Sequence, residues 1–257
     1  MKGLNGKHAL VTGGSRGIGA AISRSLLEHG ARVTILGRNQ KSLEGTKEKL
    51  QNLGEVDFVV ADVCDSDAVH QAFQQAVVRT GPVGILINNA GFGRSAPFLK
   101  TDAKLWREMM TVNFDGLVHC MQAALPDMLQ AKWGRIVNVA SIAGLRGFRY
   151  VAAYCAAKHA AIGLTRSVAL EVAMSGITVN AVCPGYTNTE MTREAVENIV
   201  TKTGQTAEDI ISELVANNPQ KRLVTPEEVA NAVLWLCLPG SEAINGQAIG
   251  VAGGEVM

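Results

Sequence analysis

Tyr154 and Lys158 are the pair of residues whose types and spacing point most directly to chemistry. They stand four positions apart in a segment with a helical pattern, so both side chains lie on one face of the expected helix. A free phenol has a pKa of about 10 and is a poor proton carrier at neutral pH. A cation one turn away favours the phenolate and lowers that pKa towards the working range. Because this spacing is common on amphipathic helices, the pair predicts a proton-transfer site only in combination with other residues.

Ser141 supplies a group that could hold the substrate. It follows an expected strand at residues 135–140, and the carboxyl ends of parallel strands are where such sheets bind ligands. A serine hydroxyl there could hold a substrate oxygen as that oxygen gains negative charge. Ser141 therefore strengthens the interpretation of Tyr154 and Lys158 as an acid–base pair.

A glycine-rich string between the first expected strand and the first expected helix predicts a bound dinucleotide. Glycines let the backbone approach a pyrophosphate, and the free N–H groups at the start of the helix point towards it. A strand before the string and a helix after it favour this interpretation over a plain tight turn. The candidate cofactor-binding residues here are Gly13, Ser15, Arg16, Gly17, Ile18 and Gly19.

The end of the second expected strand indicates which dinucleotide. An NAD-binding chain carries an acidic residue about 20 residues further on to hold the ribose 2′-hydroxyl, but this sequence has Gly37, Arg38 and Asn39 there. A guanidinium can hold a 2′-phosphate bidentately, and Arg16 is a second candidate for that phosphate. The two arginines favour NADP(H) over NAD(H). The alternative is that both are ordinary surface arginines.

The elements that must position these residues alternate between strands and helices. This alternation implies parallel βαβ units, and the apolar runs fit strands buried on both faces. The sequence thus predicts an α/β fold, with one doubly wound domain over residues 1–257. The expected strands are residues 7–12, 32–36, 57–61, 83–87, 135–139, 178–182 and 248–251. The expected helices are residues 18–29, 40–53, 66–80, 102–130 and 151–173, with a last one beginning near Thr225.

The segment at residues 190–218 interrupts this pattern. It is polar and weakly helical, and long insertions of this kind are often binding lids. It is therefore a candidate substrate lid, with a solvated pair of surface helices as the alternative.

Composition and charge argue against several other classes of protein. A net charge of +1 without basic runs argues against a nucleic-acid or membrane-surface partner. No stretch approaches the roughly 20 apolar residues of a membrane span, and the short polar start is not typical of a signal peptide. Five scattered cysteines without a CxxC pair indicate reduced thiols in a cytoplasmic protein. A metal site is not expected.

Two further motifs complete a set of five. Asn-Asn-Ala-Gly at residues 88–91 follows the fourth expected strand, and Pro-Gly at residues 184–185 follows the sixth. With the glycine string, Ser141 and the Tyr154–Lys158 pair, they resemble the short-chain dehydrogenase/reductase family over essentially the whole chain. The resemblance implies an NAD(P)-dependent oxidoreductase with a single Rossmann-like domain and a seven-stranded parallel sheet. It also implies a homotetramer or homodimer.

The same resemblance implies roles for individual residues. It makes Tyr154 the general acid/base, Lys158 its pKa partner and a ribose ligand, and Ser141 the group that orients the carbonyl. Asn113 matches a helix asparagine that supports a proton-relay water. The residues implied to contact the adenine, the cofactor cleft and the nicotinamide end are Asp62, Val63, Asn89, Ala90, Gly91, Pro184, Gly185, Thr187 and Thr189, together with Tyr154 and Lys158.

Six residues that follow strand ends or open the 190–218 segment are candidate walls of a substrate pocket. They are Phe92, Arg94, Phe148, Arg149, Tyr186 and Met191. Arg94 and Arg149 could attract an anionic or carrier-bound substrate, but solvated arginines are at least as common.

Within the family, residues 182–186 (Val-Cys-Pro-Gly-Tyr) and the tail at 252–254 (Ala-Gly-Gly) are similar to 3-oxoacyl reductases and polyketide ketoreductases. This similarity implies an NADPH-dependent carbonyl reductase acting on a ketone, such as a 3-oxoacyl thioester on coenzyme A or acyl carrier protein. One alternative is an NAD-dependent secondary-alcohol dehydrogenase of the 3-hydroxybutyrate type. Another is a non-catalytic NADP(H)-sensing binding protein, which would generally lack the tyrosine or the lysine. A halohydrin-cleaving lyase on the same scaffold would lack the glycine string.

Overall fold

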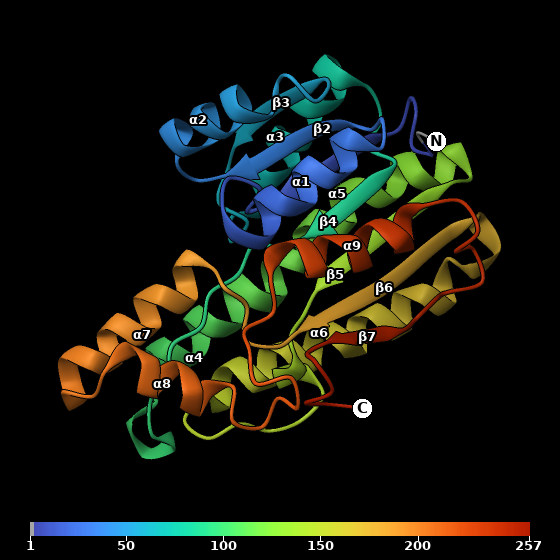
Figure 1. Ribbon diagram of the computed structural model, residues 1–257. Coiled ribbons are helices and arrows are strands. Elements are labelled where there is room, and N and C mark those ends of the chain that lie inside the picture. Colours follow the sequence, from blue (N-terminus) through green and yellow to red (C-terminus); the bar gives the residue numbers. More distant parts are fainter. Residues whose placement is uncertain (1–2) are drawn as a thin grey trace.

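Seven parallel strands form the sheet at the centre of the molecule (Figure 1). The computed structural model describes residues 3–257. The strands are β1 (His8–Thr12), β2 (Arg32–Gly37), β3 (Val56–Val60), β4 (Ile85–Asn88), β5 (Gly134–Val139), β6 (Ile177–Pro184) and β7 (Ala248–Val251). Every residue of β1, β4, β5 and β6 is buried, as expected where helices cover both faces of a parallel sheet.

Polar side chains that accept hydrogen bonds from unpaired backbone N–H groups start most of the helices. Asn39, Asp65 and Asp102 cap three of them, and Thr225 forms a capping box with Glu228. The helices are α1 (Gly17–Glu28), α2 (Gln40–Leu50), α3 (Ser66–Thr80), α4 (Ala103–Met110), α5 (Gly116–Ala131), α6 (Ala152–Glu171), α7 (Glu190–Thr203), α8 (Ala207–Leu214) and α9 (Pro226–Cys237).

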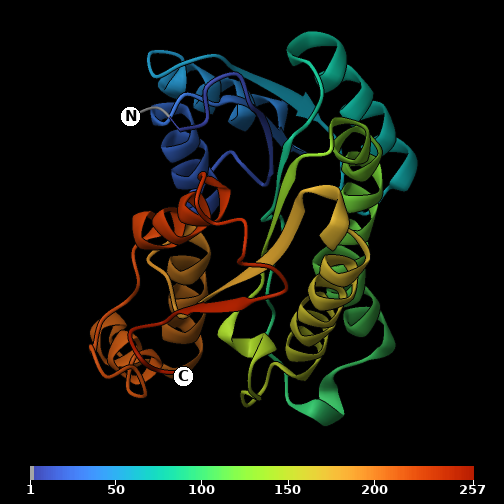
Figure 2. The same cartoon turned by 90° about the vertical axis from the view of Figure 1, so that its right-hand side faces the viewer.

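The helices form one layer on each face of the sheet (Figure 2). On one face, α1, α2 and α9 bury side chains such as Leu26, Leu43 and Val233 against the strands. On the other face, α3, α5 and α6 bury side chains such as Phe73 and Met121. The predicted α/β fold, with a parallel sheet and helices on both faces, is therefore confirmed.

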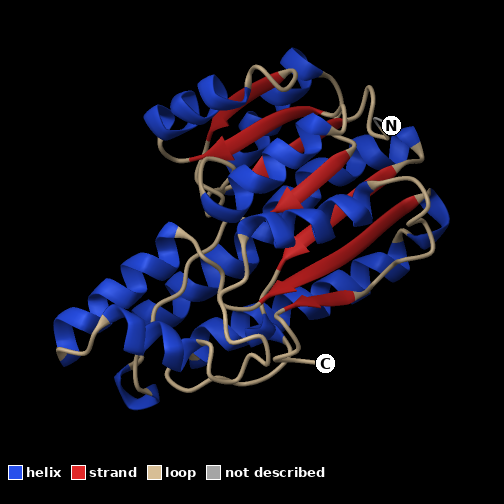
Figure 3. Ribbon diagram, viewed as in Figure 1, coloured by secondary structure: helices blue, strands red, loops and turns tan. Residues whose placement is uncertain are grey.

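All strands point their carboxyl ends towards the same side of the molecule, where α7 and α8 project (Figure 3). The strand order is β3-β2-β1-β4-β5-β6-β7, so the winding reverses between β1 and β4. In doubly wound sheets, a ligand crevice lies outside the carboxyl ends of the strands at such a switch point. The fold therefore directs the search for a site to the loops that follow β1, β4, β5 and β6.

The helix expected at residues 102–130 is not one regular helix. A π-helical turn at Thr111–Asp115 separates α4 from α5. The side-chain amide of Asn113 donates to the carbonyl oxygen of Met109 at 3.0 Å, which is the oxygen that a regular helix pairs with the Asn113 N–H. The side chain thus competes with the backbone for this acceptor, and π turns often mark functional sites.

The part of the chain that the structure describes contains neither a membrane-spanning helix nor a cluster of metal ligands. None of its helices is long and apolar enough to cross a membrane. No three of its His, Cys, Asp and Glu side chains are grouped so that they could hold a metal ion. All five cysteines carry free thiols.

Candidate active site

Ser141 and the Tyr154–Lys158 pair lie at the carboxyl end of β5 and on the adjoining helix α6. Ser141 caps the short helical turn Ile142–Gly144, because its Oγ accepts a hydrogen bond from the N–H of Ala143 at 3.1 Å. Tyr154 and Lys158 stand one turn apart near the start of α6, and Lys158 Nζ lies 5.6 Å from the centre of the Tyr154 ring. The two predicted proton-transfer side chains therefore share one face of the helix.

Lys158 is a buried cation. The residue is 5% exposed, and Nζ donates a hydrogen bond to the carbonyl oxygen of Val139 at 3.1 Å. No carboxylate among residues 3–257 forms an ion pair with it. Burial disfavours the charged ammonium and lowers the pKa of Lys158 to about 8. Lys158 is therefore charged at neutral pH but close to its titration point.

Tyr154 is a partly buried phenol that holds its proton at neutral pH. Burial raises the pKa of Tyr154 to about 12, and a hydrogen bond with Ser141 acts in the opposite direction. The lowering of this pKa predicted from Lys158 is not found in the protein alone, where burial has the largest effect on the phenol. Tyr154 is consequently a proton donor at neutral pH, with the Ser141 hydroxyl within hydrogen-bonding reach.

Asn113 and Gly91 enclose the inner side of this group. The Asn113 amide donates to the carbonyl oxygen of Phe92 at 3.0 Å and accepts from its N–H at 3.3 Å. A Cβ added to Gly91 would lie 2.7 Å from Asn113 Oδ1 and 3.5 Å from Lys158 Nζ. Only glycine leaves room between them, so residue 91 shapes the space next to Lys158.

The glycine string forms a turn that packs against the end of β4. Gly13 adopts a φ of 62°, and a Cβ on Gly19 would collide with the carbonyl oxygen of Gly13. The side chain of Asn89 donates to the carbonyl oxygens of Thr12 and Gly13 at 3.0 and 3.2 Å. Ser15 is tied to α2, since its carbonyl oxygen accepts from the Thr46 hydroxyl at 2.8 Å. These bonds hold the string in one shape.

The start of α1 leaves its first N–H groups available. Arg16 occupies the N-cap position without a capping hydrogen bond from its side chain. Gly17, with a φ of 51°, and Ile18 begin the helix, and N–H groups in the first turn have no partner within a helix. A rigid glycine cradle with free N–H groups at a helix start fits the pyrophosphate of a dinucleotide.

Arg16 and Arg38 are exposed guanidiniums at this end of the sheet. Arg38 Nη1 lies 3.6 Å from Asp62 Oδ2, and Arg16 Nη1 lies 3.4 and 3.5 Å from the carboxylates of Glu190 and Glu194. The paired side chains are 41–76% exposed, so water screens these interactions and each is weak. Both guanidiniums could exchange a carboxylate for a phosphate.

Asp62 and Val63 follow β3. Burial alone would raise the pKa of Asp62, but the hydrogen bond from the Cys64 N–H and the charge of Arg38 hold it below its usual range. Val63 packs against the start of α5, where a Cβ on Gly116 would lie 2.7 Å from it. The implied adenine-contacting pair is therefore an ionised carboxylate beside a buried aliphatic side chain.

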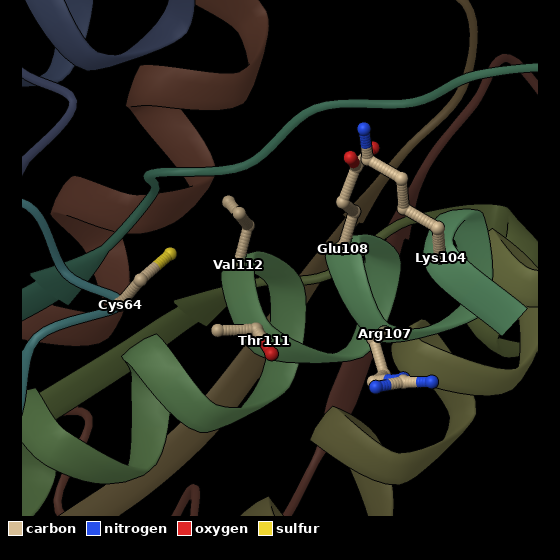
Figure 4. A pocket seen from close by; sticks show the side chains of 6 residues that line it. All are labelled: Cys64, Lys104, Arg107, Glu108, Thr111 and Val112. Carbon is tan, nitrogen blue, oxygen red and sulfur yellow. The ribbon is translucent and has the colours of Figure 1, made fainter.

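A hollow of about 420 Å³ opens next to this pair, between the loop after β3 and helix α4 (Figure 4). Its lining residues are Cys64, Lys104, Arg107, Glu108, Thr111 and Val112. The Cys64 side chain points across it towards Val112. Burial raises the pKa of the Cys64 thiol to about 11, so the thiol is not ionised at neutral pH. Tyr154, Lys158 and Ser141 do not line this hollow, so it is separate from the proposed proton-transfer groups.

The residues after β6 reach back to the glycine string. Pro184 ends β6, and the carbonyl oxygen of Gly185 accepts from the hydroxyl of Thr187 at 2.9 Å. Thr189 caps α7, and its Cγ2 would lie 3.3 Å from a Cβ on Gly17. The chain therefore encloses the space between the carboxyl ends of β1 and β6 from both sides.

The predicted pocket residues have different surroundings. Phe92 and Tyr154 pack against the same buried cluster of Leu105, Met109 and Ala153. The ring centre of Phe148 lies 4.5 Å from the guanidinium carbon of Arg146. Arg94 is paired with Glu108 at 3.6 Å on the surface. Tyr186 is 38% exposed. Met191 and Arg149 are also exposed.

Three features of the site have no counterpart in the sequence predictions. The Thr12 hydroxyl accepts from the N–H groups of both Asn89 and Ala90 at 3.0 Å. The Asn88 Oδ1 is buried and, among the described residues, has no partner; Asn88 lines a cavity of about 10 Å³ beside Lys158. A partly buried ion pair joins Arg146 to Glu255. A threonine at a strand end is a weak local signal, and the other two depend on contacts between distant segments.

Known proteins match this chain over nearly its full length. A model of the short chain dehydrogenase family matches residues 7–200. The 3-oxoacyl-[acyl-carrier-protein] reductase FabG of Chlamydia muridarum is 34% identical over 98% of each chain. The D-beta-hydroxybutyrate dehydrogenase of Rhizobium meliloti is 34% identical over 96% of this chain and 98% of its own. A crystal structure of a variant actinorhodin polyketide ketoreductase with NADPH superimposes with a TM-score of 0.93, at 36% identity and 97% coverage of both chains.

Fold, motif order and similarity to known proteins agree. The parallel sheet with its glycine string, and the serine, tyrosine and lysine at β5 and α6, are what the sequence resemblance implied. The chain belongs to the short-chain dehydrogenase/reductase family and is an NAD(P)-dependent oxidoreductase.

Proposed function

We propose that this protein is an NADPH-dependent ketone reductase in which Tyr154 gives the proton. The observation that carries the proposal is the placement of Tyr154 one helical turn from Lys158, with the Ser141 hydroxyl within hydrogen-bonding reach of the phenol. NADPH supplies the hydride when it is bound at the glycine cradle. Reduction also consumes one proton, which Tyr154 carries at neutral pH and can give to the ketone oxygen.

Ser141 and Lys158 have complementary parts in this proposal. The Ser141 hydroxyl donates to the carbonyl oxygen of the substrate as that oxygen gains negative charge. The Lys158 ammonium, one helical turn from Tyr154, stabilises the phenolate that proton transfer leaves behind. Asn113 supports the π turn beside Lys158 and completes the proposed catalytic set.

NADPH is the proposed cofactor because two exposed guanidiniums flank the predicted place of the ribose phosphate. Arg16 is the N-cap residue of α1, and Arg38 follows β2. Arg38→Asp should reverse the preference, because a carboxylate repels the 2′-phosphate and can accept from a 2′-hydroxyl. The measurement is kcat/KM with NADPH and with NADH. A variant that keeps the wild-type preference would contradict the role of Arg38.

The proposed substrate is a 3-oxoacyl thioester on coenzyme A or acyl carrier protein. It is supported by the name of the FabG relative and by the polyketide ketoreductase that shares the fold. We further propose that residues 190–218, which contain α7 and α8, form a lid over this substrate. We propose Phe92, Phe148 and Tyr186 as walls of the substrate pocket. We also propose that the protein is a homotetramer or homodimer in the cytoplasm.

Tyr154→Phe tests the chemistry directly. Removing the hydroxyl should lower kcat for ketone reduction by a factor of about 100 or more, while NADPH binding, followed by its fluorescence, changes little. The substrates are 3-oxoacyl thioesters, cyclic ketones and aryl ketones. Unchanged turnover across this panel would refute Tyr154 as the proton donor. Failure of the thioesters alone would remove the proposed substrate and leave the mechanism.

An NAD-dependent secondary-alcohol dehydrogenase is the second candidate, because a D-beta-hydroxybutyrate dehydrogenase is equally similar in sequence. It differs from the first candidate in cofactor and in the charge of its substrate. Faster oxidation of 3-hydroxybutyrate with NAD⁺ than reduction of any 3-oxo ester with NADPH would favour it.

A further inference from the structure

Arg146 and Glu255 join the turn after Ser141 to the end of the chain. Arg146 Nη2 lies 2.7 Å from Glu255 Oε1, although 109 residues separate them in the sequence. The side chain of Glu255 is 2% exposed and that of Arg146 is 38% exposed. A carboxylate this deep in a protein keeps its charge only with a cation beside it. This pair therefore differs from the exposed ion pairs of Arg16 and Arg38.

The Arg146 guanidinium keeps donors that the protein does not use. The ion pair with Glu255 engages Nη2, and no side chain or backbone oxygen within residues 3–257 accepts from Nη1. Nε also has no partner there, but it is buried, so Nη1 is the donor that a ligand can reach. The guanidinium carbon lies 4.5 Å from the centre of the Phe148 ring, and stacking of this kind holds the plane of the group. A guanidinium carries five N–H donors in a fixed fork, so this one can bind a further oxygen atom.

Tyr186 connects the pair to the proposed proton donor. Burial raises the pKa of Tyr186; the charge of Glu255 raises it further, and the charge of Arg146 opposes the rise. The charges of both groups thus act on the Tyr186 phenol. Burial is the largest cause of the raised pKa of Tyr154, and Tyr186 is a smaller one. Strand β7, which leads to Glu255, also pairs with β6, which leads to Tyr186. Arg146, whose N–H donates to the carbonyl oxygen of Ile142 in the turn after Ser141, therefore meets the segment after β7 beside the strand that leads to Tyr186.

The net charge of the Arg146–Glu255 pair decides whether it binds a charged carboxylate oxygen or a neutral carbonyl oxygen. Glu255 neutralises Arg146, so the pair offers hydrogen bonds without a net positive charge. A free carboxylate would gain the hydrogen bonds of Arg146 but would be repelled by Glu255. An ester or thioester carbonyl oxygen carries no net charge and needs only the donors.

We propose that Arg146, positioned by Glu255, is a specificity-determining residue that donates to the acyl carbonyl oxygen of a 3-oxo ester or thioester and discriminates against the free 3-oxo acid. This inference rests on the proposed ketone reduction and adds the residue that recognises the acyl group. The ketone oxygen remains with Ser141 and Tyr154.

Ethyl acetoacetate and acetoacetate test the proposal, because they carry the same ketone and differ in the charge of the acyl group. The wild-type protein should have the higher kcat/KM for the ester. Glu255→Gln keeps the side-chain shape and leaves the charge of Arg146 uncompensated. It should raise kcat/KM for acetoacetate relative to the ester by roughly tenfold, because hydrogen bonds to charged partners are stronger by about that factor.

The double variant Glu255→Gln/Arg146→Gln is the matched control. It removes the uncompensated charge, so the ratio of the two kcat/KM values should return towards that of the wild type. Arg146→Gln alone should raise KM for the ester several-fold with kcat little changed. An unchanged ratio in a folded Glu255→Gln protein, or an unchanged KM in Arg146→Gln, overturns the inference.

Calorimetric binding of acetoacetate separates this inference from the proposed function. If the wild type reduces ethyl acetoacetate and Glu255→Gln gains no affinity for acetoacetate, the role of Arg146 is wrong and ketone reduction stands. If the wild type reduces neither ketone and Glu255→Gln still gains affinity for acetoacetate, the proposed reduction is wrong and the role of Arg146 in selecting charge stands.

Discussion

Loss of water moves the pKa values of Tyr154 and Lys158 in opposite directions. The phenol rises to about 12 and the ammonium falls to about 8, because burial favours the neutral form of each group. At neutral pH the donor is thus protonated while the lysine still carries its charge. This combination suits proton donation to a carbonyl, since a cation is present when the phenolate forms. Alcohol oxidation would need the phenolate at the outset and so a higher pH.

Lys158→Met should stabilise the protein while it abolishes turnover. In the folded wild type, Lys158 is charged at pH 7 despite a pKa lowered from 10.5 to about 8. Since each pKa unit corresponds to about 1.4 kcal/mol, removal of the charge should raise the free energy of unfolding by up to about 3 kcal/mol at pH 7. Urea denaturation measures this gain, and Lys158→Arg is the control that keeps the charge.

The gain should depend on pH in a defined direction. Between about pH 8 and pH 10.5 the folded wild type loses the Lys158 proton, while the unfolded chain keeps it. The unfolded state then binds more protons, so wild-type stability rises with pH through this window and the advantage of Lys158→Met shrinks. A constant difference between pH 7 and pH 10 would contradict the lowered pKa.

Residue types predicted which groups meet in this site but not their protonation. The spacing of Tyr154 and Lys158 predicted that they share one face of a helix. The position of Ser141 directly after a strand predicted that it lies at the carboxyl edge of the sheet. The prediction of a lowered tyrosine pKa considered only the charge of Lys158. Desolvation depends on residues from β5, α4 and the loop after β4, which surround α6 only in the folded chain, so spacing carries no information about it.

Helix α7 and the glycine string meet at two points. Thr189, which caps α7, lies against Gly17, and Arg16 contacts the carboxylates of Glu190 and Glu194 at 3.4 and 3.5 Å. In the proposed NADPH complex, Arg16 would exchange these carboxylates for a phosphate. Cofactor binding and the position of the proposed lid would then be coupled through one side chain.

Glu190→Gln/Glu194→Gln should tighten NADPH binding. The double variant removes two negative charges that compete for Arg16, and exposed pairs of this kind contribute about 0.2–1 kcal/mol. The Kd for NADPH should therefore fall roughly two- to fivefold, whereas the Kd for NADH, which lacks the 2′-phosphate, should change less. Fluorescence titration measures both. Glu197→Gln on the same helix is the control, and an equal change for both cofactors would point to general charge instead of Arg16.

The order of strands and helices could be predicted because the strands are apolar runs and most of the helices between them begin at a polar capping residue. The π turn at Thr111–Asp115 could not, because it depends on a side-chain hydrogen bond of Asn113 with Phe92 and Met109. Residues 190–218 were predicted only as weakly helical. Thr189 and Thr206 cap two distinct helices there, α7 and α8.

The two ends of the sheet differ in what they hold. The carboxyl ends hold the candidate site, and the amino end of β5 holds a second buried cation, Arg135. Its guanidinium donates to the carbonyl oxygen of Gly134 at 3.0 Å and pairs with Glu242 at 3.2 Å. Trp133 lies between Arg135 and Lys7, at 5.0 and 3.6 Å from its ring centre. At about 3.3 Å per residue along a strand, this group is about 20 Å from Ser141, so it should affect stability without affecting chemistry.

Glu242→Ala tests that separation between the ends of the sheet. The side chain of Arg135 is 2% exposed, so loss of its carboxylate partner leaves a buried charge with poorer compensation and should lower the free energy of unfolding by more than the loss of an exposed ion pair does. The kcat/KM for a ketone should stay at the wild-type value. Glu28→Ala is the matched control, because its exposed pair with Arg24 on one helix should contribute only about 0.3–0.5 kcal/mol. Equal losses in the two variants would show that Arg135 does not depend on Glu242, and a fall in kcat/KM would show that the two ends are coupled through β5.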